Sequence, residues 1–124
     1  LARWTLDREP QPAGPIAVGA VSGAFFLIRK TDFDQLGGFD EHYFMHFEDV
    51  DICRRALEAG GAVIYVPAAG ALHYGSTSDV PSDFVTAHKA RSLSRYLRKF
   101  ARNPVERLLV ELAVPFVGLA MRLH

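Results

Sequence analysis

Apolar positions along this chain follow helical spacing in some segments and form continuous runs in others. Val50, Cys53, Ala56 and Leu57 stand at i, i+3, i+6 and i+7, which is the pattern of one helix face. The pattern ends at two consecutive glycines, which commonly stop a helix. We therefore expect a helix over residues 49–59 with an apolar inner face.

Three stretches have the composition of strands. Residues 16–28 form a continuous apolar run rich in β-branched and aromatic side chains, interrupted at Ser22 and Gly23. This run predicts one or two buried strands with a bend at that point. Shorter apolar runs at 62–66 and 71–74 predict two more strands of a small sheet.

Capping residues delimit three more helices. Thr31 is expected to cap a short helix over 32–36, which a glycine pair then closes. Ser82 is expected to cap a long helix that ends near residue 101. An Asn-Pro-x-Glu sequence then predicts the start of a last helix over 104–123, which Pro115 should kink.

These elements predict an α/β fold with a short mixed sheet, flanking helices and a C-terminal helical tail. We expect three parts: an extended lead-in over residues 1–15, a main unit over 16–102 and an apolar helix over 103–124. A chain of 124 residues is long enough for one domain or part of one.

Composition narrows the class of protein. The chain is 49% hydrophobic and 23% charged, which is typical of a globular protein. Fourteen basic residues balance fourteen acidic ones, which argues against a dedicated nucleic-acid binder. The single cysteine, Cys53, is expected to be a buried thiol in a reducing, cytoplasmic compartment. The start of the chain has no apolar signal core and no initiating methionine, as expected of an excised piece.

Candidate chemistry is concentrated between residues 37 and 60, where six carboxylates share the segment with two histidines and four aromatic residues. Within it, Glu48 and Asp49 stand where an aromatic loop becomes a helix. Backbone N–H groups and the helix dipole hold a carboxylate at such a place ionised, as a general base requires. A purely structural capping role is the alternative. The apolar loop before the pair predicts that the acidic turn lies beside a cleft, and Asp51 is the next candidate base.

The two C-terminal helices have surface features that point to partners. The uncharged stretch 112–121 is too short to span a bilayer, so contact of 104–123 with a membrane surface or another chain fits better. Burial against its own domain is the alternative. The basic face over 82–102 is suited to anionic lipid or a diphosphate-linked acceptor, or is a solvated surface.

Several motifs in one order carry a family resemblance. SGAFFLIRK (22–30), LGGFDEHYFMHFEDVDICRRALEAG (36–60), VIYVP (63–67) and LHYGSTS (72–78) resemble the C-terminal half of family 2 glycosyltransferases, in particular rhamnosyltransferase-like members. The resemblance implies a partial GT-A fold and an inverting transfer of a sugar from a nucleotide diphosphate donor. The implied acceptor is a hydroxyl of a cell-surface polysaccharide or a lipid-linked glycan.

The resemblance also assigns roles to residues. It implies that Asp49 is the catalytic base and that Glu48 helps to position the acceptor. It further implies a divalent-metal ligand at His73, for which a structural hydrogen-bonding role is the alternative. The implied acceptor side consists of Phe39, Asp40, Ser22, Gly23 and Arg55.

The family's nucleotide-binding units and Asp-x-Asp metal motif have no counterpart here, since Asp49-Val50-Asp51 belongs to the predicted helix. We therefore expect Mg²⁺ or Mn²⁺ to bind only with the family's N-terminal half, and this chain to be inactive alone. A non-catalytic oligomerisation or membrane-docking module is the alternative function. A calcium-type domain is disfavoured because the acids lack the regular loop spacing. Exposed strands are expected to allow a homodimer.

Overall fold

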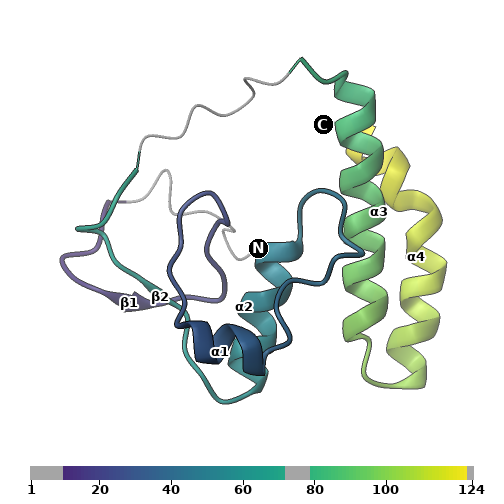
Figure 1. Cartoon of the computed structure of the whole chain (residues 1–124). Coiled ribbons are helices and arrows are strands. Elements are labelled where there is room, and N and C mark those ends of the chain that lie inside the picture. Colours follow the sequence, from purple (N-terminus) through teal and green to yellow (C-terminus); the bar gives the residue numbers. More distant parts are fainter. Residues whose placement is uncertain (1–9, 72–78, 123–124) are drawn as a thin grey trace.

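The computed structural model describes residues 10–71 and 79–122. Its elements, in chain order, are β1 (Ile16–Ala17), α1 (Lys30–Gln35), α2 (Glu48–Glu58), β2 (Ile64–Tyr65), α3 (Ser82–Phe100) and α4 (Pro104–Arg122). Figure 1 shows a small α/β part that contains β1, β2, α1 and α2 beside a hairpin of α3 and α4. The loop between α1 and α2 extends towards α3 and joins the two parts.

The sheet is smaller than the sequence predicts. β1 and β2 pair antiparallel over two residues each, with Ile16 opposite Tyr65. The prediction of one or two buried strands over 16–28 is wrong, because the two residues of β1 are exposed and the rest of the segment is irregular. Leu27 in this segment is 98% exposed. Strand backbone requires a hydrogen-bonding neighbour, and among the described residues β2 supplies one for only two positions. The predicted strand at 71–74 falls largely outside the described residues.

Helix α1 begins earlier than predicted. Its N-cap is Arg29, which makes no side-chain capping bond, so the prediction of a Thr31 cap is wrong. Ion pairs from Arg29 and Lys30 to aspartates three and four residues later stabilise the first turns instead. The predicted glycine stop is confirmed, because Gly37 and Gly38 adopt φ angles of 78° and 71°.

Helix α2 lies within one residue of its predicted bounds. The loop before it ends with His46 and Phe47 at φ angles of 62° and 71°, an uncommon conformation for non-glycine residues that turns the chain sharply into the helix. The inner face contains Ile52 and Cys53, as expected for the thiol, and also the fully buried Asp51.

The α3–α4 hairpin starts each helix differently. Pro81 is the N-cap of α3, so Ser82 is the first helical residue and not the predicted cap. The predicted start of α4 is confirmed: Asn103 Oδ1 accepts a bond from the Glu106 N–H at 2.9 Å. The side chain of Glu106 in turn accepts the Arg102 N–H at 2.7 Å. None of the helices in the described ranges has an apolar stretch long enough to cross a bilayer.

Candidate active site

Asp49 is held by backbone groups from two segments that are far apart in sequence. Its Oδ2 accepts a hydrogen bond from the Gly23 N–H at 2.8 Å, and its Oδ1 accepts one from the N–H of Val50 at 2.8 Å. The side chain is half-buried. Each carboxylate oxygen has two lone pairs, so both oxygens retain capacity to accept a bond from an outside hydroxyl.

The contact between Asp49 and Gly23 leaves little room for a side chain at position 23. A Cβ atom added at Gly23 would lie 3.3 Å from the Asp49 Cβ and 3.5 Å from its Oδ2. Ser22, also predicted on the acceptor side, is exposed and accepts a bond from the Ala24 N–H at 3.3 Å. The turn at residues 22–24 is therefore shaped to present one N–H to the carboxylate.

Glu48 is adjacent to this carboxylate. It is half-buried, and among the described residues its Oε2 is enclosed without a hydrogen-bond partner. An enclosed acceptor that lacks a partner costs about 1–3 kcal/mol. The atom has almost no accessible surface, so an outside hydroxyl would reach it only after a local shift of the side chain.

Asp51, the alternative base, is buried, and both of its carboxylate oxygens pair with cations. Its side chain has no exposed surface. Its Oδ2 pairs with Arg55 Nε at 2.6 Å, and its Oδ1 pairs with Lys99 Nζ at 2.6 Å. Tyr43 also donates to it at 3.2 Å. Burial, followed by the charge and hydrogen bond of Asp51, raises the pKa of Tyr43 well above its usual value. Asp51 is therefore out of reach of a substrate hydroxyl.

Asp40 is a second carboxylate that pairs with Lys99. Its side chain is 11% exposed and contacts Arg95 at 2.9 Å and Lys99 at 2.8 Å, both on α3. Burial raises the pKa of Asp40, but hydrogen bonds from Lys99, Arg95 and His42 outweigh it and hold the pKa well below its usual range. Lys99 thus lies between two carboxylates, one from the loop and one from α2.

Arg55 and Phe39 lie beside the same loop. The Arg55 guanidinium donates to the carbonyl oxygens of Leu36 and Gly38, the latter at 2.8 Å, in addition to its pair with Asp51. The ring of Phe39 packs edge-on against Phe33, with ring centroids 5.3 Å apart. The donors of Arg55 therefore fasten the end of α1 to α2.

Sequence reasoning brought together the right segment but missed its buried network. The i, i+4 spacing of Asp51 and Arg55 is a signal for an ion pair on one helix, and it was available in the sequence. No local signal connects Lys99 or Arg95 with acids 48–59 residues earlier. A basic helix face predicted to be solvated or lipid-facing is thus partly paired with the acidic loop.

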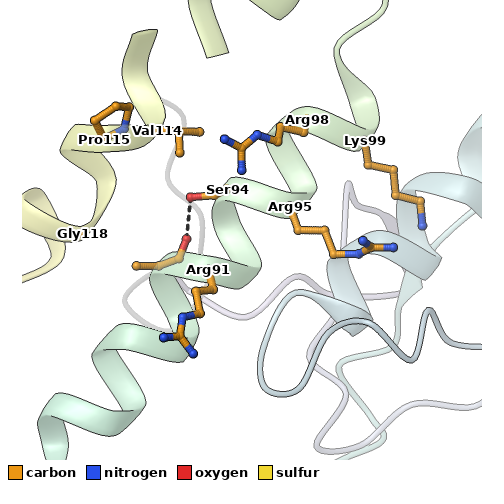
Figure 2. A pocket seen from close by; sticks show the side chains of 9 residues that line it. Arg91, Ser94, Arg95, Arg98, Lys99, Val114, Pro115 and Gly118 are labelled. Carbon is orange, nitrogen blue, oxygen red and sulfur yellow. Dashed lines mark hydrogen bonds between the residues drawn. The ribbon is translucent and has the colours of Figure 1, made fainter. Parts of the chain in front are cut away.

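The predicted cleft beside the acidic turn is not where the described cavity lies. An open cavity of about 760 Å³ is lined by residues of α3 and α4, and by none of the predicted site residues. Figure 2 shows Arg91 and Arg98 on one wall, with Val114 and Pro115 on the other.

The described residues also do not fit a metal site. Over 10–71 and 79–122, nowhere do three His, Cys, Asp or Glu side chains converge. His73, the predicted ligand, lies outside the described residues.

Comparison with known proteins decides the family. A family model described as "Glycosyltransferase like family 2" matches residues 13–104. The chain belongs to this family. The match includes both segments that form the Asp49 site, and it ends at the first residue of α4. The resemblance of the sequence motifs is thereby confirmed.

Curated relatives of this family 2 chain are rhamnosyltransferases. It is 47% identical over 89 residues to the N-acetylglucosaminyl-diphospho-decaprenol L-rhamnosyltransferase of Mycobacterium tuberculosis, which covers 68% of this chain and 29% of the relative. It is 42% identical over 80 residues to Rhamnosyltransferase WbbL of Escherichia coli K12, with 63% and 30% covered. The chain thus spans less than a third of the length of these relatives. No solved structure matches it.

Proposed function

We propose that this chain forms the acceptor side of an inverting glycosyltransferase of GT-A type, with Asp49 as the catalytic base. The observation that carries the proposal is the fixed, half-buried Asp49 carboxylate, held by the N–H groups of Gly23 and Val50 at 2.8 Å each. Such a group is rigid, negatively charged and reachable, which are the properties that a general base needs.

The reaction is a single displacement. As Asp49 takes the proton of an acceptor hydroxyl, the hydroxyl oxygen forms a bond to the anomeric carbon of the donor sugar. The bond between that carbon and the diphosphate oxygen breaks, and the diphosphate leaves with the electron pair. One base is sufficient because attack and departure occur on opposite faces of the sugar. No covalent enzyme intermediate forms, so Cys53 has no role as nucleophile.

Neighbouring residues have supporting roles in this proposal. Glu48, adjacent to Asp49 in the first turn of α2, helps to position the acceptor. Phe39, Asp40, Ser22 and Gly23 form the acceptor side, and Arg55 acts as a positioning residue through its bonds to the 36–38 turn.

The substrate classes follow from the relatives. Both names support a rhamnosyl group as the transferred sugar, and the name of the Mycobacterium tuberculosis relative supports a polyprenyl-diphosphate-linked N-acetylglucosamine as the acceptor. An acceptor of this kind would bring the protein to a membrane surface as a peripheral enzyme. The chain spans less than a third of its relatives' length, so we propose that the nucleotide-sugar donor and its divalent metal bind only together with the family's N-terminal half, and that this chain alone is inactive.

A non-catalytic module is not favoured, because the family match covers the segments that form the Asp49 site.

The test of Asp49 as the base is Asp49→Asn in the full-length enzyme. We expect turnover to fall by about 10²–10⁴-fold with donor affinity unchanged, since only proton transfer is lost. The matched control is Asp83→Asn, which changes an exposed aspartate in the first turn of α3. Near-normal turnover of Asp49→Asn would contradict the proposal.

A further inference from the structure

Helix α4 carries an apolar stripe on the side that faces away from α3. The side chains of Val105, Leu109, Leu112, Phe116 and Leu119 are between 59% and 67% exposed. The opposite side of the helix, with half-buried valines at 110, 114 and 117, packs along α3. In the part of the chain that the structure describes, no element covers the stripe.

The spacing of the stripe is that of a coiled-coil seam. Its members follow one another at intervals of four, three, four and three residues from Val105 to Leu119. This is the repeat by which one helix packs against another through knobs-into-holes contacts. Two small, exposed residues beside it, Ala113 and Ala120, permit close approach of a second helix backbone. Pro115 lies beside the seam and not in it.

The charges on α4 favour a helix over a lipid surface as the partner. Helices that lie in a membrane interface carry lysine and arginine on their polar face. Over residues 104–121 of α4 the charged side chains are Glu106, Arg107 and Glu111, two acids and one base. Glu111 also pairs with Arg98 of α3 at 2.7 Å, which neutralises one cation of the neighbouring helix.

We propose that α4 pairs with the α4 helix of a second copy of this chain. A seam that is apolar at every position is complementary to itself, so one patch can form both sides of a two-fold interface. Its exposed side chains offer on the order of 500 Å² per copy, or about 1,000 Å² for a pair, near the lower limit for specific interfaces. The dimer is therefore weak and concentration-dependent.

Sedimentation velocity of the full-length protein at concentrations of about 1–100 µM tests this proposal. The unmodified protein should shift from monomer to dimer with rising concentration, and Leu112→Glu should stay monomeric throughout. The matched control is Leu27→Glu, which places the same new charge on a leucine that is 98% exposed and distant from α4 in sequence. It should dimerise like the unmodified protein.

A second variant covers the case in which Leu112→Glu loses helix content by circular dichroism. Phe116→Ala removes a seam side chain while keeping a strong helix former, and should weaken the dimer at least tenfold. The proposal is overturned if the unmodified protein is monomeric at every concentration, or if Leu27→Glu rather than the seam variants abolishes dimerisation. It is equally overturned if the seam variants sediment unchanged and instead lose binding to phosphatidylglycerol-containing vesicles.

Discussion

At the scale of single residues, the position of Asp49 depends on a contact between the turn at 22–24 and the start of α2. The Gly23 N–H lies 2.8 Å from Oδ2, and a Cβ atom at this position would crowd the Asp49 side chain. The second N–H comes from the first turn of α2 itself. Two donors from separate segments fix both the location and the rotation of the carboxylate.

Gly23→Ala tests this dependence. The added methyl group would lie 3.3 Å from the Asp49 Cβ, so the aspartate must move by a few tenths of an ångström. We expect kcat to fall about tenfold, since small displacements of a reacting group are costly, while donor affinity is unchanged. The control is Gly19→Ala, where an added Cβ meets nothing within 4 Å. Equal kcat values for the two variants, measured in the full-length enzyme, would refute the contact's role.

The acidic residues illustrate what the sequence can predict at this scale. Helix spacing and the preceding aromatic loop correctly placed Glu48 and Asp49 at the start of α2. The same helical spacing did not reveal that Asp51 is buried, since an acidic residue at that position ordinarily faces solvent. Its burial depends on Lys99 and Arg55, and the Lys99 contact is set by tertiary packing alone.

At the scale of elements, α3 is joined to the acidic segment by ion pairs and by a hydrogen bond. Lys99 contacts Asp51 at 2.6 Å and Asp40 at 2.8 Å. About two turns nearer the N-terminus of the same helix, Ser92 donates a hydrogen bond to the Met45 carbonyl at 2.6 Å. The loop between α1 and α2 thus contacts α3 at two points, Asp40 and Met45. These contacts fix the start of the helix that contains Asp49.

Lys99→Met should loosen this junction. It leaves Asp51 buried with one cation fewer, and breaking a buried ion pair from one side costs about 3 kcal/mol or more. We therefore expect the free energy of unfolding, measured by urea denaturation, to fall by about 3 kcal/mol. Lys89→Met, on the exposed side of the same helix, should leave it unchanged. Equal stability of the two variants would show that the Lys99 pairs contribute nothing.

Helix ends and strands differ in how well the sequence predicts them. The capping bonds at Asn103 and Glu106 are local, so the sequence alone identified the start of α4. Thr31 and Ser82 have side chains suited to capping, but the N-caps of α1 and α3 are two residues and one residue earlier, respectively. Strand length depends on partners, and β1 ends after two residues because its described ladder does.

At the scale of the whole molecule, the α/β part and the helical hairpin are held together by a network of opposite charges. Asp40 lies at its centre, with Arg95 and Lys99 on α3 as partners. The α/β part also exposes large apolar side chains, among them Phe25 at 61% and Ile64 at 47%. Apolar exposure of this extent is typical of a surface that meets further protein.

The charge network predicts how stability depends on pH. The pKa of Asp40 in the folded protein lies below the unfolded value of about 3.9. The stabilisation is therefore complete above about pH 4 and is lost as the pH falls towards the folded pKa. Urea denaturation between about pH 2 and pH 6 should show this loss, and Asp40→Asn should reduce the slope. An unchanged slope in Asp40→Asn would assign the acid sensitivity to other carboxylates.

The most direct test of Asp49 as the base is a structure of the full-length protein with its acceptor bound. We predict that the reacting hydroxyl oxygen lies about 2.6–3.2 Å from an Asp49 oxygen, the reach of direct proton transfer. The Gly23 N–H should still hold Oδ2 in that complex. A hydroxyl placed against another base, with Asp49 out of its reach, would contradict the account.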